Sequence, residues 1–291
     1  MNPTLLPAQI PAAIAARLRQ IGTVVETAET GALYAPLHPR EPYANVHVIR
    51  DQAYGDDPRH LLDVFIPQHA DDTPRPVFIF VHGGGFVAGN KRSDDSPFYD
   101  NLMLWAVANG LVGVNITHRL APTHPWPAAQ HDLAAALTWL QAHHPAPVIL
   151  MGHSAGAVHI AQYLAHPALR RADDGVRAAV LLSGIYDLCT GVYDVQTANT
   201  AAVRAYFGDD PAQYPARSAL PGLTTCGVPL CIAYAAHDPA DFQQQALLLA
   251  EACALPAYRL MEHTHMSEIY AVNADEALTA PFSRFIGVHS K

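Results

Sequence analysis

The sequence predicts an α/β protein with a mostly parallel, doubly wound sheet that is flanked by helices. Several short runs are apolar throughout, and residues 76–81 (PVFIFV) are the clearest example. Such runs lack the polar alternation of half-exposed strands and are typical of parallel strands buried on both faces. Stretches with helical spacing lie between these runs, and strands that alternate with helices predict right-handed βαβ units.

The first 40 residues differ from this pattern. Ile10, Ile14, Leu18 and Ile21 recur at helical spacing and predict an amphipathic helix. This helix either packs on the domain or forms part of a small cap over an active site, and both interpretations fit the sequence equally well.

The alternating elements then follow in order. Strands are expected at residues 61–67, 76–81, 111–116, 149–151, 177–182, 229–235 and 257–261. Helices are expected at residues 97–109 and 128–144, directly after residue 156, and at residues 242–254. The alternation lapses over 183–223, which predicts a cap element or a long ordered loop above the sheet. We expect a single domain over residues 1–291, with 1–40 and 183–223 as the small cap.

Composition excludes several classes of function. The chain has 291 residues, half of them hydrophobic, and a formal net charge of −9. Its 17 Lys and Arg residues are scattered, which argues against nucleic-acid or membrane partners, because both need basic patches. The four cysteines do not form a disulfide framework. The sequence shows neither a secretory signal nor a membrane-spanning run, so a cytoplasmic protein is expected.

The stretch Gly152-His153-Ser154-Ala155-Gly156 is the strongest chemical signal. It is a G-x-S-x-G pattern that follows a buried strand and leads into an apolar-periodic helix, as the nucleophile elbow requires. Glycine two residues to either side removes side chains that would collide in so tight a turn. Ser154 is therefore the candidate nucleophile, exposed at the C-terminal edge of a sheet.

A serine nucleophile needs a base that is oriented by an acid, and in this fold the acid precedes the base in the chain. The strand at 229–235 runs into Asp238, and the chain returns to the same edge at His265. Asp187 is a rival acid and His263 a rival base. Placement favours Asp238 and His265 but leaves both alternatives open.

A glycine-rich turn supplies the candidate oxyanion hole. His82-Gly83-Gly84-Gly85-Phe86 follows the buried strand at 76–81. Consecutive glycines let backbone N–H groups approach a substrate oxygen. A phosphate-binding loop is the competing interpretation, but neither G-K-S/T nor G-x-G-x-x-G is present.

The 17 histidines raise the question of a metal. His263-x-His265 has the spacing to chelate from one face of a strand, but no helical His-Glu spacing accompanies it. We therefore expect no catalytic metal and no cofactor.

Six segments together resemble the α/β-hydrolase fold, and within it esterases of the hormone-sensitive-lipase and BD-FAE-like type. They are HGGGFVAGNK (82–91), HRLAPTHPWPAAQHDLAAALTWL (118–140), GHSAGA (152–157), SGIYDL (183–188), HDPADF (237–242) and HTHMSEI (263–269). The likeness extends over residues 45–290. HDPADF and THMS are similar to kynurenine formamidases in particular.

The resemblance implies a Ser154, Asp238 and His265 triad, with Gly84, Gly85 and Ala155 as oxyanion donors. It thus selects Asp238 over Asp187 and His265 over His263. The implied activity is hydrolysis of carboxylic esters with short acyl chains through an acyl-enzyme. An arylformamidase is the alternative, and a non-catalytic binding protein of the same fold is a third.

The chain also departs from these esterases. His118 stands where they usually carry tyrosine, and Thr123 where glutamate is common. The resemblance implies that Arg119 and Asp132 form a structural ion pair that holds the glycine-rich loop.

The partner is expected to be a small ester. Phe86, Trp126 and Tyr186 are candidate pocket residues, although aromatic residues of this kind more often serve only packing. The oligomeric state is open, with a dimer as one possibility.

Overall fold

The computed structural model describes residues 2–68, 74–190 and 198–290. Among these residues, nine strands form one sheet in the order β1-β9-β8-β7-β6-β4-β5-β3-β2. The strands are β1 (Thr4–Leu6), β2 (Val46–Ala53), β3 (Leu61–Pro67), β4 (Val77–Val81), β5 (Val112–Ile116), β6 (Val148–His153), β7 (Val176–Leu182), β8 (Leu230–His237) and β9 (Ala257–Thr264). Only the β2–β3 and β3–β5 pairs in this sheet are antiparallel. The predicted mostly parallel sheet is confirmed.

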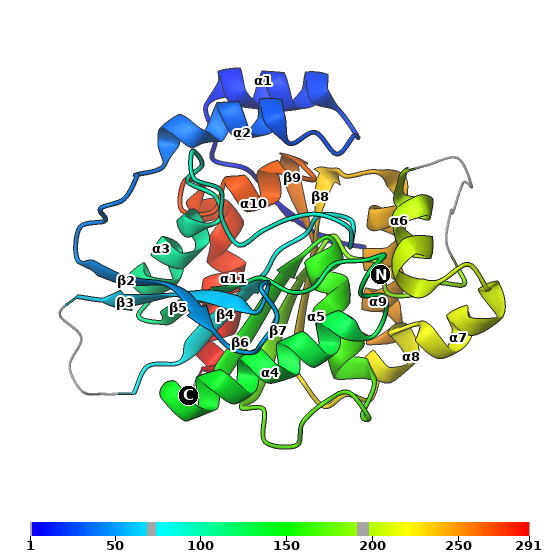
Figure 1. Ribbon diagram of the computed structural model, residues 1–291. Helices are drawn as coiled ribbons and strands as arrows, with labels where there is room; N and C mark the ends of the chain where they lie inside the picture. Colours follow the sequence, from blue (N-terminus) through cyan, green and yellow to red (C-terminus); the bar gives the residue numbers. More distant parts are fainter. Residues whose placement is uncertain (1, 69–73, 191–197, 291) are drawn as a thin grey trace.

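Helices cover both faces of the sheet (Figure 1). They are α1 (Ala12–Ile21), α2 (Ala28–Tyr34), α3 (Asp100–Ala108), α4 (Ala128–His143), α5 (Ala155–Ala165), α6 (Ala198–Phe207), α7 (Tyr214–Arg217), α8 (Leu220–Leu223), α9 (Ala240–Ala252), α10 (Ser267–Tyr270) and α11 (Glu276–His289). Two short 3₁₀ turns, Ala35–Leu37 and Pro211–Gln213, accompany them.

The central strand β4 shows why its sequence is apolar throughout. Val77, Ile79 and Val81 pack into the core beneath α4, α5 and α9, whereas Phe78 and Phe80 pack into the core beneath α3 and α11. Successive side chains of a strand point to opposite faces, so a strand between two helical layers has no solvent-facing position. The expected double covering of the sheet is confirmed.

The two edge strands and the helices α2, α10 and α11 are additions to the predicted elements. β1 is only three residues long, and Leu5 within it is 57% exposed. β2 alternates exposed and half-buried residues on its antiparallel edge. Neither strand has the buried apolar run that marks the central strands.

The predicted N-terminal helix is confirmed as α1, which buries Ile14 and Leu18. α2 contacts α10, and both N-terminal helices lie over the end of the sheet where β9 leads into α10 (Figure 1). The segment 183–223 leaves the sheet after β7 and contains α6, α7 and α8, while residues 191–197 lie outside the described part. The cap function of both segments and the single-domain boundary stay predictions.

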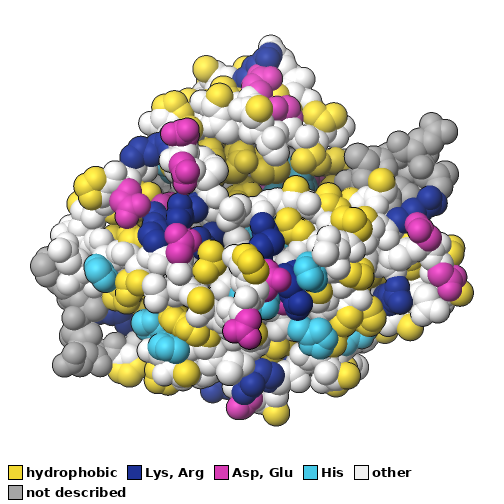
Figure 2. All heavy atoms as spheres, viewed as in Figure 1, with side chains coloured by type: hydrophobic (Ala, Val, Ile, Leu, Met, Phe, Trp, Pro, Cys, Tyr) yellow, Lys and Arg dark blue, Asp and Glu magenta, His cyan; other side chains and the backbone are white. Residues whose placement is uncertain are grey.

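The surface carries charges of both signs close together. Figure 2 shows Lys and Arg side chains interleaved with Asp and Glu on the visible face. Among the described residues, no helix is long and apolar enough to cross a membrane. All four cysteines are free thiols.

Candidate active site

Ser154 lies in a strained turn between β6 and α5. Its φ of 55° and ψ of −124° belong to a region that non-glycine residues rarely adopt. A Cβ on Gly152 would lie 2.5 Å from backbone atoms of Gly156, and one on Gly156 would lie 2.0 Å from the carbonyl oxygen of Val81. Both positions therefore require glycine, for the packing reason that the sequence pattern predicts.

Asp238 and His265 meet at the same edge of the sheet. The carboxylate follows β8, the imidazole follows β9, and His265 Nδ1 lies 2.7 Å from Asp238 Oδ1. The other carboxylate oxygen, Oδ2, accepts hydrogen bonds from Ser183 Oγ at 2.6 Å and from the Ala235 N–H at 2.8 Å. With Nδ1–H donated to Asp238, the imidazole keeps a free lone pair on Nε2.

The rival residues are engaged elsewhere. Asp187 accepts hydrogen bonds from the backbone N–H groups of Cys189 and Thr190, in the turn after β7. His263 Nε2 lies 3.2 Å from Asp275 Oδ2, and its Nδ1 lies 3.1 Å from Ser267 Oγ. The structure thus brings Asp238 and His265 together, and it places Asp187 and His263 in separate hydrogen-bond networks.

The glycine-rich turn lies against Ser154. A Cβ on Gly83 would lie 3.1 Å from Ser154 Cβ, and the next three residues, Gly84, Gly85 and Phe86, all have positive φ. Gly84 admits no side chain, because a Cβ there would lie 2.1 Å from the Ala88 carbonyl oxygen. Ala155 is the first residue of α5, where N–H groups have no partner within the helix.

A second segment holds this turn in place. The Ala121 N–H donates to the carbonyl oxygen of Phe86 at 3.0 Å. Two residues earlier, Arg119 Nη2 lies 2.6 Å from Asp132 Oδ1. The predicted Arg119–Asp132 ion pair is confirmed.

A small cavity of about 20 Å³ adjoins Ser154, room for about one water molecule. Its lining residues are Gly85, Phe86, Ser154, Ala155, Val158, Ile185, Ala202, Val203 and Phe242. The Phe242 ring also contacts the His265 ring, with centroids 4.5 Å apart, so His265 lies close to the same cavity.

The three aromatic pocket candidates lie in different places. Phe86 lines the cavity. Trp126 is half-buried and donates its indole N–H to Gln162 Oε1, and Tyr186 is fully buried with its hydroxyl accepting from the Gly184 N–H. Neither belongs to the lining of the cavity beside Ser154.

Three buried histidines pack together behind the glycine-rich turn. The His82 and His118 rings stack with centroids 4.4 Å apart, and the His118 and His159 rings meet edge to face with centroids 4.5 Å apart. Burial lowers the pKa of all three imidazoles, well below the usual range for His82 and His159. His118, which replaces the usual tyrosine, therefore sits in a neutral aromatic stack.

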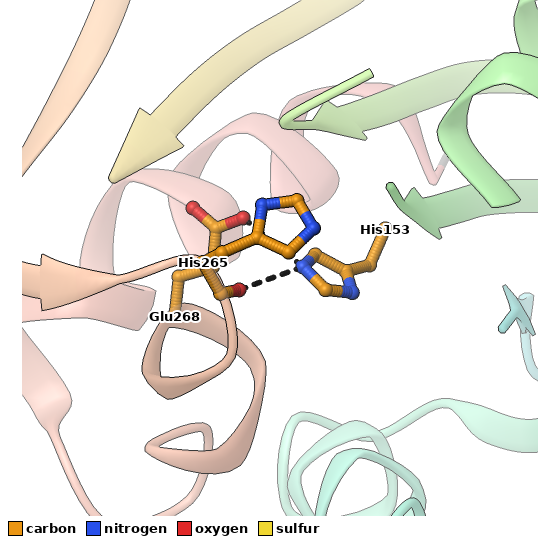
Figure 3. A group of neighbouring side chains, drawn as sticks. All are labelled: His153, His265 and Glu268. Carbon is orange, nitrogen blue, oxygen red and sulfur yellow. Dashed lines mark hydrogen bonds and ion pairs between the residues drawn. The ribbon is translucent and has the colours of Figure 1, made fainter. Parts of the chain in front are cut away.

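The site also contains polar residues to which the sequence analysis gave no catalytic function. Figure 3 shows His153, His265 and Glu268 side by side. His153 Nε2 donates to the His265 carbonyl oxygen at 2.8 Å and lies 3.2 Å from Glu268 Oε1. Ser183 supports Asp238 from β7. His153 lies within the segment GHSAGA and Glu268 within HTHMSEI. Their packing against Asp238 and His265 depends on strand pairing between residues distant in sequence.

Comparison with known proteins identifies the family to which this fold belongs. The sequence profile of the alpha/beta hydrolase fold matches residues 78–258, which is more than half of the chain. Tuliposide A-converting enzyme b1 of Tulipa gesneriana, an amyloplastic protein, is 34% identical over 171 residues. That match covers 53% of this chain and 42% of the tulip protein, so the chain spans less than half the length of this relative.

Solved structures show the same fold over nearly the whole chain. Esterase B from Lactobacillus rhamnosis has a TM-score of 0.73 at 18% identity, covering 96% of this chain and 95% of that chain. An esterase from the bacterial hormone-sensitive lipase family has a TM-score of 0.70 at 24% identity, covering 97% and 100%. The chain belongs to the α/β-hydrolase fold family, and the predicted family fold is confirmed.

Proposed function

We propose that this protein is a serine carboxylesterase that hydrolyses small carboxylic esters through an acyl-enzyme. The observation that carries the proposal is the 2.7 Å contact between His265 Nδ1 and Asp238, at the sheet edge that also presents the strained Ser154. A base oriented by a carboxylate beside a serine on a nucleophile elbow is the arrangement that activates a hydroxyl. The structural likeness to proteins named as esterases supports the same activity.

In the proposed mechanism, His265 Nε2 takes the proton of Ser154 as the hydroxyl attacks the ester carbonyl. Asp238 holds the imidazole in the required tautomer and stabilises its cation. The N–H groups of Gly84, Gly85 and Ala155 bind the oxyanion, and one such donor typically lowers the barrier by about 3–4 kcal/mol. The alcohol leaves with the proton from His265, and water then releases the acyl group by the reverse steps.

The cavity size supports a preference for short acyl groups. About 20 Å³ beside Ser154 accommodates about one water-sized group, and the lining is apolar. An acetyl methyl group matches this space, whereas a longer chain requires the walls to move. We therefore expect p-nitrophenyl acetate to be hydrolysed with a higher kcat/KM than the octanoate ester.

Ser154→Ala tests the function directly. Turnover of p-nitrophenyl acetate should fall to the level of the buffer blank, and a fluorophosphonate probe that labels the wild type should no longer label the variant. Circular dichroism of both proteins checks that the fold is retained. Unchanged turnover by Ser154→Ala would reject the nucleophile assignment.

A substrate panel separates the proposal from its alternatives. Short-chain aryl esters should be hydrolysed ahead of N-formyl aryl amides, and the reverse order would identify an arylformamidase instead. A folded wild-type protein that neither turns over esters nor reacts with the probe would be a binding protein. Cytoplasmic location and the lack of nucleic-acid and membrane partners stay predictions.

A further inference from the structure

Glu268 is a buried carboxyl group for which the proposed mechanism has no use. It lies on α10, three residues after the base, and its side chain is fully buried. Neither carboxyl oxygen makes a hydrogen bond of good geometry within the described part of the chain. An unpaired buried carboxylate is costly, so its position behind the triad requires an explanation.

The groups that face Glu268 come from the ends of several strands. His153 Nε2 lies 3.2 Å from Glu268 Oε1, and the His265 ring lies 4.7 Å from the His153 ring. Asp238 and Ser183 both influence the pKa of Glu268. A charge on Glu268 in turn influences the pKa of Tyr186. Burial keeps the pKa of His153 well below its usual range and raises that of Tyr186, so neither supplies a charge at neutral pH.

These surroundings disfavour a negative charge on Glu268. Burial raises the pKa of Glu268 well above its usual value, and the neighbouring Asp238 charge raises it further, while Ser183 opposes the rise. A carboxyl group without a cationic partner in a dry site stays protonated. Protonation changes its chemistry, because a neutral carboxyl group gains an O–H donor.

The proton positions argue against a metal ion among these three residues. His153, His265 and Glu268 place one ligand-type atom each within 4.8 Å of one another. However, His153 Nε2 lies 2.8 Å from a carbonyl oxygen, which only accepts, so this nitrogen carries a hydrogen. His265 Nδ1 is likewise the donor to Asp238. A metal held through His153 Nε2 and His265 Nδ1 would have to displace both bonds.

We propose that Glu268 is a positioning residue that acts as an uncharged acid. Its side chain packs against His153, whose Nε2 lies 3.2 Å from Glu268 Oε1 and donates to the His265 carbonyl oxygen, so the uncharged group supports His265 without adding a second negative charge beside Asp238. This inference rests on the proposed function, because it assigns Glu268 to the support of that triad. Ser183 and His265 both donate to Asp238, while His153 lies between Glu268 and the backbone of His265.

Substitutions at Glu268 separate charge from shape. Glu268→Gln keeps the size and an N–H donor, so kcat for p-nitrophenyl acetate should stay near the wild-type value. The acid limb of its kcat/KM profile between pH 5 and pH 9 should superimpose on that of the wild type. Glu268→Ala removes the support and should lower kcat about 10- to 100-fold with little change in KM. Glu276→Gln, the same change on the exposed first turn of α11, is the matched control and should behave as wild type.

Two results would overturn the proposal. A Glu268→Gln acid limb displaced by about one pH unit or more would show that the wild-type residue is charged. Full kcat in Glu268→Ala would show that it positions nothing, and if this variant does not fold, the Glu268→Gln profile decides alone. Failure of the esterase proposal gives a different result: the wild type does not hydrolyse the ester, or the Ser154→Ala variant still does.

Discussion

Asp238 has three hydrogen-bond donors, and they define its role in the site. His265 Nδ1 donates to Oδ1, while Ser183 Oγ and the Ala235 N–H both donate to Oδ2. Two donors on Oδ2 fix the plane of the carboxylate, which in turn fixes the orientation of the imidazole. Asp187 lies after β7, and its carboxylate accepts from the backbone of its own turn and from Ser218 Oγ at 3.1 Å.

Asp238→Asn should therefore reduce kcat by about 10,000-fold, because an amide that donates to Nδ1 leaves the imidazole in the wrong tautomer. Asp187→Asn carries the same chemical change one strand away and should retain kcat within about tenfold of wild type, with its loss seen in stability instead. Steady-state kinetics with p-nitrophenyl acetate measures both. Equal losses at the two positions would leave Asp238 without its assigned role.

Sequence reasoning at this scale works where a residue type and its local context determine the geometry. Gly152 and Gly156 mark the elbow because no side chain fits there, and this signal is readable from five consecutive letters. Glu268 could not be assigned in this way. Its neighbours Asp238 and Ser183 directly follow β8 and β7, so its environment exists only after the strands pair.

The helix α6 supplies one wall of the cavity beside Ser154. Ala202 and Val203 come from this helix, and they face Phe86 and Phe242 across the space beside Ser154. Val203 is 2% exposed and belongs to the apolar cluster that contains Phe86. The side chain of Val203 thus limits the cavity volume on the side of the 183–223 segment.

Val203→Ala should enlarge the cavity and shift specificity toward longer acyl chains. One methylene of discrimination corresponds to about 10-fold or more in relative kcat/KM, so the ratio of butyrate to acetate turnover should rise by about that factor. Val114→Ala, an equally buried valine on β5, is the control and should lower stability without changing the ratio. An unchanged ratio of butyrate to acetate turnover in Val203→Ala would show that α6 does not line the acyl site.

The element list shows the same division between local and long-range signals. Central strands such as β4 are predictable because burial on both faces requires an apolar run. β1 is a three-residue edge strand, and its pairing with β9 depends on residues distant in sequence. The boundaries of helices such as α4 and α9 follow their apolar periodicity to within about two residues.

For the whole molecule, the stack of His82, His118 and His159 links stability to pH. Burial lowers the pKa of each ring in the folded state, while the unfolded chain keeps the ordinary value of about 6.5. Below that value the unfolded state binds more protons than the folded state, so stability falls as the pH drops. Above it, both states are neutral and this contribution does not change.

The free energy of unfolding should therefore decrease between pH 6.5 and pH 5 by up to about 1.4 kcal/mol per pH unit for each ring. His118→Tyr removes one of the three rings and should reduce this slope by about one proton. His143→Tyr changes an exposed histidine and should leave the slope as it is. Urea denaturation at several pH values gives the pH dependence of the free energy of unfolding. The same pH dependence in His118→Tyr and wild type would show that His118 does not contribute to it.

The pairing of β1 with β9 affects the order in which the strands can join the sheet. Thr4 pairs with Tyr258, so the first strand to be synthesised waits for the last before it can join the sheet. The elbow on β6 is finished well before the ribosome reaches His265, and long-range pairings of this kind form late. A nascent chain thus carries Ser154 before it has His265, and the proposed hydrolytic activity should appear during refolding only when β9 docks.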